Sequence, residues 1–372
     1  MTKIQKTDEC IVYKNPIPLL RSRQAKFPGV TLLPSGELIV LFAIGEAFDA
    51  ADSKTYVSRS SDQGKSWQFQ GALYNPALLP KDLNISEDLK PTLLDDGTLV
   101  AMGCRYHRPD ADTPISNTET GGLLRGDNVI SFSRDEGKTW SVPEVIDRGC
   151  SELVETSGPC IQTQSGHLIA IGCPFKKWDG SNPIGQTGVL LRSTDQGKSW
   201  DGSGRFFETP DNSLSPWESR ICEMSPGRLV SIAWTFNIAA NKHLANHVTV
   251  SHDDGYTWSS PIDTDIIGQA SNLMPFGNNR LLTIHAHRAS DVGLYVRLVD
   301  FTNDQWQVID ETVIWGAAKA QDTSKGFIEQ FGDLQFGQPS LVQLENGEVL
   351  ATHWCVEGGQ HIIKTHRLNI SL

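Results

Sequence analysis

Two acidic side chains stand next to apolar stretches of the sequence, where a carboxyl group could take part in acid–base chemistry. Glu218 comes just before the strand-like run Arg220–Met224. A carboxyl group that is partly removed from water often has a raised pKa, which suits it to proton transfer. Asp49 lies in a polar loop with Glu46 and Asp52, and loops held by a rigid scaffold often carry functional groups. Glu218 and Asp49 are therefore the first candidates, with the other two loop acids as competitors.

Several histidines form a second group that could transfer protons or bind a ligand. His285 and His287 alternate along one apolar segment, so both side chains face the same way if the segment is a strand. A lone His-x-His pair is weak evidence for a metal, and we predict no metal site from it. Proton transfer or hydrogen bonding to a substrate is the favoured interpretation. His353 ends a similar apolar segment, and His107 begins a long insertion.

A repeated turn motif shows which elements must position these residues. The pattern S-x-D-x-G-x-x-W occurs four times, beginning at Ser60, Ser133, Ser193 and Ser251. In this pattern Asp bonds to its own backbone, Gly takes a positive φ, and Trp packs beneath the turn. Four copies indicate a repeat protein, and they assign the motif aspartates to turn structure rather than to catalysis.

A weaker repeat lies upstream of these turns and divides the chain into six units. Six times, an apolar segment leads through a turn to a second apolar segment; the turn residue is Gly36, Gly97, Gly166, Gly227, Asn279 or Gly347. Asn replaces Gly sensibly because it tolerates the left-handed region. Two further strands follow each pair, and the early segment Ile11–Pro18 is expected to pair with the last unit and close a ring. We therefore predict an all-β fold, a six-bladed β-propeller with four-stranded antiparallel blades, forming a single domain over residues 1–372.

The predicted architecture nominates site positions, because the innermost strands of a propeller converge on a central channel. Innermost strands would begin near Lys26, Glu87, Asp88, Lys90, Glu155, Glu218, Arg220, Asn272, Gln335 and Gln338. Second strands would end near Glu46, Asp49, Arg105, His107, Arg108, Trp234, His285, His287, Arg288 and His353. Charged groups beside buried strands are costly unless they are paired or functional, so a polar pocket is expected. We predict that the substrate is bound by Lys26, Glu46, Arg105, His107, Arg220, His285, His287, Gln338 and His353.

Composition narrows the possible partners. A net charge of −12 disfavours a nucleic-acid partner, which needs a basic face. No apolar run approaches membrane-spanning length, and the first residues lack the apolar core of a secretory signal. Seven scattered cysteines without a CxxC motif fit a reducing cytoplasm. No motif calls for a metal or another cofactor, and the oligomeric state is left open.

The repeated turn resembles the Asp-box (BNR repeat) of the sialidase superfamily, and the resemblance extends over the whole chain. It implies a propeller that acts on a carbohydrate. The acid/base aspartate of that family corresponds to Asp49, in the loop before the first repeated turn. The glutamate that activates the family's nucleophile corresponds to Glu218, in the segment Trp217-Glu218-Ser219.

The sequence also departs from true sialidases. Lys26 stands where the family has an arginine, no arginine lies near Trp234, and Arg288 is only a loose counterpart of the third one. Gln338 occupies the position of the nucleophilic tyrosine. A covalent tyrosyl intermediate is therefore not expected, and we predict a sugar other than ordinary sialic acid. Two carboxyl groups roughly 6.5–9.5 Å apart would suit inverting hydrolysis, with Asp49 as general acid/base and Glu218 as the second carboxylate.

Two alternatives from other classes stay open. A propeller lyase would use His285, His287, His353 or a lysine to remove a proton beside a sugar carboxylate. A carbohydrate-binding propeller without catalysis would bind its ligand unaffected by the loss of either carboxylate. The resemblance in fold does not distinguish hydrolysis, elimination and ligand binding without catalysis.

Overall fold

The computed structural model describes residues 3–80, 83–149, 153–316, 318–325 and 327–371, and its strands form six antiparallel sheets. Blades one and two comprise β2 (Gln24–Leu32), β3 (Leu38–Gly45), β4 (Lys54–Ser60) and β5 (Gln68–Ala72), then β6 (Ile85–Leu93), β7 (Leu99–His107), β8 (Gly126–Ser133) and β9 (Glu144–Val145). Blade three comprises β10 (Val154–Glu155), β11 (Ile161–Gln162), β12 (Leu168–Pro174), β13 (Gly188–Ser193) and β14 (Asp201–Phe207).

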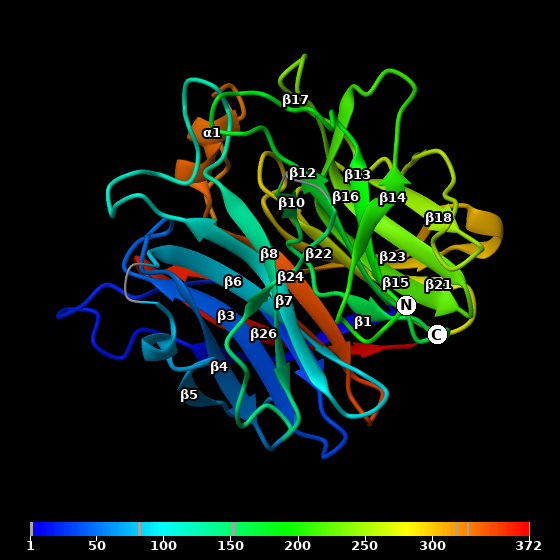
Figure 1. The fold of residues 1–372 in the computed structure, drawn as a ribbon. Coiled ribbons are helices and arrows are strands. Elements are labelled where there is room, and N and C mark those ends of the chain that lie inside the picture. Colours follow the sequence, from blue (N-terminus) through cyan, green and yellow to red (C-terminus); the bar gives the residue numbers. More distant parts are fainter. Residues whose placement is uncertain (1–2, 81–82, 150–152, 317, 326, 372) are drawn as a thin grey trace.

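The second half of the chain builds the other three blades. Blade four comprises β15 (Leu214–Ser225), β16 (Arg228–Asn237), β17 (Lys242–His243), β18 (His247–Ser251) and β19 (Ile262–Asp263); blade five comprises β20 (Ser271–Pro275), β21 (Arg280–His287), β22 (Gly293–Asp300) and β23 (Gln307–Trp315). Blade six comprises β24 (Phe336–Gln343), β25 (Val349–Glu357), β26 (Gln360–Ile370) and β1 (Ile4–Tyr13). Helical turns are short: η1 (Pro76–Leu78), η2 (Thr302–Asp304), α1 (Phe327–Gln330) and η3 (Phe331–Asp333). The predicted six-bladed, all-β propeller is confirmed (Figure 1).

The two ends of the chain close the ring together, as predicted. β1 is the outer strand of blade six and pairs antiparallel with β26, from Ile4 opposite Ile370 onward. The Ser371 amide donates to the Lys3 carbonyl at 2.9 Å, and the two termini lie side by side in Figure 1. The strand begins at Ile4, well before the predicted start at Ile11, because its first half is an exposed polar edge that carries no apolar signal.

The turn residues behave as the upstream repeat predicts. Gly36, Gly97, Gly166, Gly227 and Gly347 have φ between 73° and 85°, and Asn279 has φ 51°. Each lies between the first two strands of its blade. The left-handed conformation that tightens these hairpins is thus supplied by Gly five times and by Asn once.

The repeated turns join neighbouring blades. A Cβ on Gly64 would lie 2.7 Å from Leu350 of blade six, and one on Gly137 would lie 2.5 Å from Ile39 of blade one. Inside each turn, a serine such as Ser193 accepts a hydrogen bond from the glycine amide at 2.8 Å. The turns are therefore structural, as the sequence predicts, and their glycines let adjacent blades approach closely.

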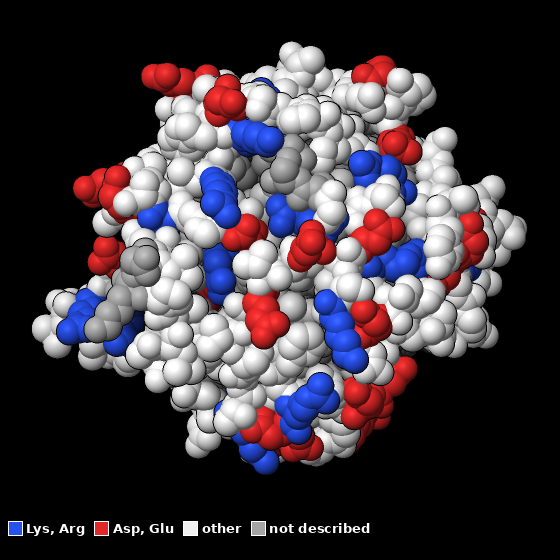
Figure 2. Space-filling model, in the orientation of Figure 1, with Lys and Arg blue, Asp and Glu red and all other residues white. Residues whose placement is uncertain are grey.

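Apolar side chains fill the spaces between blades. Leu41 and Val57 of blade one pack with Leu89, Ala101 and Val129 of blade two in one buried cluster. The inner sheet positions read as nearly continuous apolar runs because they are covered on both faces. On the face drawn in Figure 2, acidic and basic side chains are interspersed. Within the described ranges, no helix has both the length and the apolar character needed to cross a membrane.

Candidate active site

All six blades contribute to one cavity of about 200 Å³ at the rim of the channel. It lies where innermost strands begin and second strands end, as the repeat predicts. Its lining is Lys26, Phe27, Phe48, Asp49, Asp88, Tyr106, Ile115, Ser116, Gly121, Leu123, Glu155, Phe175, Trp217, Glu218, Trp234, Arg288, Leu334 and Gln338. Charged groups and aromatic rings thus meet in one concave site, as in enzyme pockets for small polar ligands.

Three innermost strands are distorted at this cavity. Phe27, Glu218 and Gln338 have φ of 56°, 45° and 39°, each at a register shift in the pairing of β2, β15 or β24 with the next strand. A positive φ is costly for residues other than Gly, and a bulge re-aims a side chain. The fold therefore maintains strained backbone at three points around one site, a pattern that is concentrated at functional sites.

Two glutamates with different surroundings line the cavity. Glu218 Oε1 accepts a hydrogen bond of 2.6 Å from the Gln338 amide, while its Oε2 is buried with no partner. Glu155 ends β10 on the neighbouring blade, and its Oε2 is likewise buried without a partner. Burial, helped by the nearby Glu218 and opposed by Arg220, raises the pKa of Glu155 to about 8. At neutral pH, Glu155 therefore holds a proton.

Arg220 is not among the residues that line the cavity. Its guanidinium donates to Ser157 Oγ at 2.6 Å and to the Glu218 carbonyl at 3.1 Å. Burial lowers the pKa of Arg220, and the charges of Glu218 and Glu155 oppose that shift. The predicted substrate-binding residue is thus a support that fixes the Glu218 backbone and balances the carboxylates.

Two cationic side chains face the cavity. Lys26 is 4% exposed, and its Nζ lies 5.0 Å from the Phe48 ring centre and 5.5 Å from that of Phe27. Burial lowers the Lys26 pKa to about 8, opposed mainly by Asp49. Arg288 donates to the Phe336 carbonyl at 2.7 and 2.9 Å and to Gln269 at 2.6 Å. The Lys26 ammonium therefore meets aromatic faces, whereas Arg288 is held by the protein.

Asp49 is fixed at the edge of the cavity. Its Oδ1 accepts a hydrogen bond from Arg108 at 3.0 Å, and its Oδ2 accepts one from the Ile115 amide at 2.8 Å. Asp88 lies nearby and pairs with the buried Lys90 at 2.7 Å. The structure thus brings both predicted carboxylates, Asp49 and Glu218, into one cavity.

Aromatic rings form the wall beside Glu218. Trp217 stacks on Phe236 with ring centres 4.4 Å apart and meets Trp234 edge-on at 5.4 Å. Phe175 lies parallel to Trp217 at 6.3 Å. This wall is apolar and aromatic beside the carboxylates, the mixture typical of pockets for small polar ligands.

Tyr106 is a cavity residue that the choice of candidates missed. It lies between Arg105 and His107 on β7, so strand alternation sends its side chain to the opposite face from theirs. Burial raises the Tyr106 pKa well above its usual range, with help from the charges of Cys104 and Glu155. A tyrosine that stays protonated is a hydrogen-bond donor and a poor nucleophile.

Three predicted residues of the first two blades lie outside the cavity lining. Arg105 pairs with Glu87 at 3.0 Å in the interior, and His107 pairs with Asp127 at 2.6 Å. Glu46 lines a separate hollow near β3 and β4. Arg105 and His107 are thus paired with carboxylates of their own blade, and Glu46 lies on another surface. The structure does not bring these three side chains together with Glu218.

The predicted histidines also lie elsewhere. His285 and His287 share a face of β21, as the alternation predicts, but His285 is fully buried and bonds to Asn246 at 2.9 Å. His287 contacts Arg297 at 3.2 Å, and His353 contacts His366 at 2.9 Å inside blade six. Burial lowers the pKa of His287 to about 4 and that of His353 to about 3. These side chains are neutral packing groups in the structure.

Metal and thiol chemistry find no obvious site in the described residues. No three His, Cys, Asp or Glu side chains among them cluster as metal ligands. The six described cysteines are unpaired, and Cys150 lies outside the described residues. A cytoplasmic location stays a prediction.

Comparison with known proteins gives the fold a context. No protein-family model and no curated protein matches the chain. A protein of unknown function from Dyadobacter fermentans superposes with a TM-score of 0.76 at 20% identity, covering 100% of both chains. An alpha-L-arabinanase of Penicillium chrysogenum, solved with arabinobiose, gives 0.65 at 14% identity over 98% of both chains. The Hadza microbial sialidase Hz136 gives 0.63 at 18% identity, over 92% of this chain and 65% of the sialidase. The chain therefore has a sialidase-like propeller fold.

Proposed function

We propose that this protein is a glycoside hydrolase acting on a sugar other than ordinary sialic acid. The observation that carries the proposal is the pair of glutamates in one cavity, with Glu155 protonated and Glu218 held by the Gln338 amide. A protonated carboxyl group beside a second carboxyl group is the usual acid–base arrangement of glycoside hydrolysis. The names of the structural neighbours, an arabinanase and a sialidase, support a carbohydrate substrate.

Each carboxyl group has one role in the proposal. Glu155 gives its proton to the glycosidic oxygen as the bond from that oxygen to the anomeric carbon breaks. Glu218 takes a proton from the water that attacks the anomeric carbon. Asp49, predicted as the acid/base, already accepts hydrogen bonds on both oxygens, so we propose that it orients the substrate.

The remaining cavity groups would hold the sugar. Trp217 and Trp234 contribute apolar edges to the wall, and Tyr106 donates a hydrogen bond. Lys26 is the cation best placed for an acidic group of the substrate, because it lines the cavity and its ammonium has no hydrogen bond or salt bridge within the described residues. The proposal requires no metal.

A panel of aryl glycosides, including a sialoside, tests this function. We expect one neutral or acidic glycoside to be cleaved, and Glu155→Gln or Glu218→Gln to lower kcat/KM by about 10²–10⁴-fold. Asp49→Asn should cost about ten-fold and mostly raise KM. Glu144→Gln, on the outer strand β9, is the matched control and should have no effect. A larger loss in Asp49→Asn than in Glu155→Gln would return the proton-donor role to Asp49.

A lyase is a second candidate because of Lys26. A buried lysine with a pKa of about 8 is partly neutral near pH 8 and can remove a proton beside a sugar carboxylate. Elimination leaves an unsaturated product that absorbs ultraviolet light, whereas hydrolysis does not. Absorbance from a uronate substrate, lost in Lys26→Met, would replace hydrolysis by elimination.

A further inference from the structure

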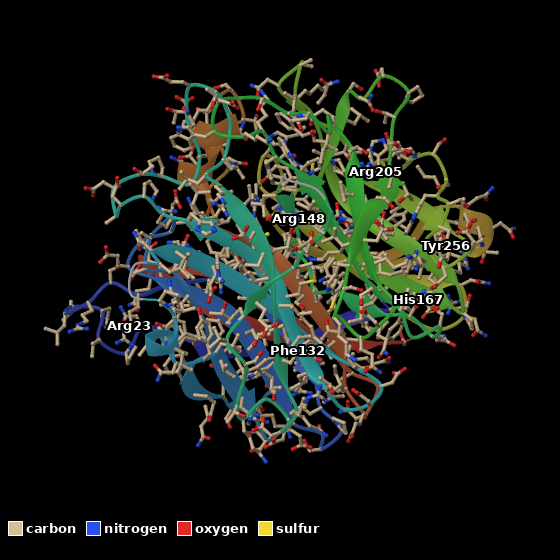
Figure 3. All side chains as sticks on the ribbon, viewed as in Figure 1. Arg23, Phe132, Arg148, His167, Arg205 and Tyr256 are labelled. Atoms are coloured by element: carbon tan, nitrogen blue, oxygen red, sulfur yellow. The ribbon has the colours of Figure 1, made fainter. Side chains whose placement is uncertain are left out.

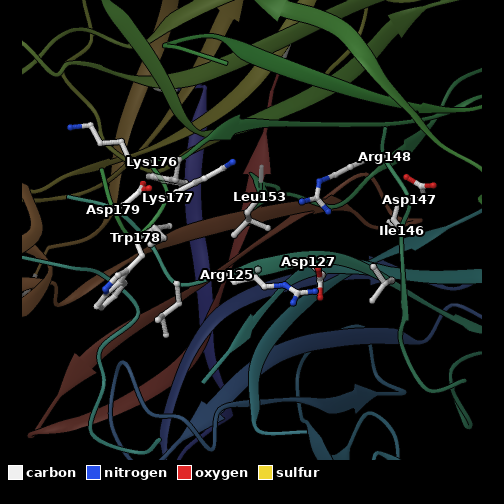
Figure 4. Close-up of a pocket in the computed structure, with 15 residues that line it drawn as sticks. Arg125, Asp127, Ile146, Asp147, Arg148, Leu153, Lys176, Lys177, Trp178 and Asp179 are labelled. Carbon is white, nitrogen blue, oxygen red and sulfur yellow. The ribbon is translucent and has the colours of Figure 1, made fainter. Parts of the chain in front are cut away.

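A second hollow adjoins the cavity and is lined partly by the long connections between β7 and β8 (residues 108–125) and between β12 and β13 (residues 175–187). It has a volume of about 740 Å³ and lies beside β8 and β10. Leu123 and Phe175 line both this hollow and the cavity, so the two are adjacent. We call the hollow the side groove (Figure 4).

The two connections are tied to each other at the edge of the side groove. Leu123 bridges Lys177, and its amide donates to the Lys176 carbonyl at 2.9 Å. The Trp178 carbonyl accepts hydrogen bonds from Asn117 at 3.1 Å and from Thr120 at 2.8 Å. The loops at the boundary between cavity and groove are thus held together by hydrogen bonds, although they lie outside the main strands.

The chemistry of the side groove differs from that of the chain as a whole. The chain has a net charge of −12, yet the groove carries four cationic side chains: Arg125, Arg148, Lys176 and Lys177. Figure 4 shows the heads of Arg148 and Lys177 turned toward the middle of the hollow. Trp178, with 39% of its surface exposed, adds an aromatic face.

The three acidic residues of the side groove are engaged by neighbouring groups. Asp127 pairs with His107 at 2.6 Å, Asp147 accepts from the Gly149 amide at 3.1 Å, and Asp179 accepts from Ser181 Oγ at 2.6 Å. Arg125 is exposed, and its side chain has no hydrogen bond or ion pair within the described part of the chain. The positive charge of Arg125 is therefore available to a ligand.

We infer that the side groove binds the acidic continuation of an oligosaccharide whose terminal sugar occupies the cavity. The inference rests on the proposed function, because it names the substrate class of the same site. The shared wall residues Leu123 and Phe175 place the groove next to the cavity, Trp178 gives a face for a ring, and the exposed Arg125 gives the preference for acidic sugars. The substrate is then a uronate-bearing oligosaccharide rather than a single sugar.

Calorimetry tests the inference by measuring how oligogalacturonates of two and six sugars bind to the full chain. The Glu218→Gln background is used to prevent turnover. The six-sugar probe is expected to bind about ten-fold tighter than the two-sugar probe, and a neutral galactan oligosaccharide of six sugars should lack that gain. Raising the salt concentration should weaken binding of the acidic probe.

Variants test whether the tighter binding of the six-sugar probe arises in the side groove. Arg125→Glu and Trp178→Ala are expected to remove the ten-fold gain and to leave the two-sugar affinity unchanged. The matched controls are Arg134→Glu, exposed in a repeated turn, and Tyr256→Ala, exposed and distant from Arg148 in Figure 3; both should keep the gain. Equal affinity for both lengths, equal affinity for the neutral chain, or a gain that survives both groove variants would overturn the inference.

The outcome is separable from that of the proposed function. Loss of the length gain in the groove variants, combined with no cleavage of any glycoside in the panel, would support the groove and remove the hydrolase. Hydrolysis that depends on Glu155, combined with no length gain, would support the hydrolase and remove the groove.

Discussion

Two parts of the blades depart from regular strand geometry, and they differ in how their polar atoms are satisfied. In the repeated turns, Ser193 accepts from the Gly197 amide at 2.8 Å and donates to Asp195 at 2.8 Å. In the bulges at the cavity, Oε2 of Glu218 and Oε1 of Gln338 are buried with no partner. The backbone has positive φ in both places.

The difference separates structural from functional distortion. The turn places Gly and the residue before it at positive φ and bonds its Ser and Asp side chains locally, so it stabilises the fold. The bulge places Glu218 and Gln338 at positive φ and leaves polar atoms unmatched, which costs free energy in the empty protein. Such a cost is consistent with a site whose ligand supplies the missing partners.

The largest expected effect concerns the turns. Gly137→Ala should lower the free energy of unfolding by about 3 kcal/mol, because its Cβ would lie 2.5 Å from Ile39 of the next blade at a φ of 77°. Gly97→Ala is the matched control, with φ 83° and open space around the Cβ, and should cost about 1 kcal/mol. Chemical denaturation measures both; equal losses would show that contact between blades adds nothing to the turn.

A smaller effect tests the cost of the site. Because its folded-state pKa is raised to about 8, Glu155 stabilises the fold fully only below pH 4.5, and stability falls as the pH rises to about 8. Glu155→Gln cannot ionise, so its Tm should match the wild type near pH 4 and exceed it by about 2–4 °C at pH 9. Glu144→Gln should match the wild type throughout. A Tm difference that is independent of pH would contradict the raised pKa.

The smallest effect concerns backbone strain at a bulge. Gln338→Asn should raise the free energy of unfolding by about 0.5 kcal/mol, because Asn tolerates the left-handed region better than Gln. The shorter side chain would also lose its hydrogen bond to Glu218, so activity should fall. Gln343→Asn, at the exposed end of β24, is the control for the substitution itself. Lower stability in Gln338→Asn would show that the bulge is unstrained.

The repeats predict the fold because each blade has its own local signal. Gly36 and its five counterparts define hairpins, and the repeated turns add the outer strands. The start of β1 could not be predicted, because an exposed edge strand paired with distant residues shows no apolar alternation. Local periodicity predicts buried strands well and edge strands poorly.

The position of a residue in the strand repeat predicted the cavity lining better than the reactivity of its side chain did. The repeat nominated Asp88, Glu155, Trp234 and Arg288, all of which line the cavity. The choice of Arg105 and the histidines favoured reactive side chains on the strand face that packs inside the blades. Their neighbours Tyr106 and Arg288 face the cavity instead, a one-residue difference that depends on where each strand ends.

Titration of Glu155 tests the central claim most directly, since it needs no substrate. Carbon-13 NMR of protein labelled at the glutamate side-chain carboxyl carbon follows every glutamate, and the Glu155→Gln variant identifies the relevant signal. The account predicts a midpoint near pH 8 for Glu155. A midpoint near the ordinary glutamate value of about 4.3 would contradict it, because Glu155 would then be ionised at neutral pH and unable to donate the proton.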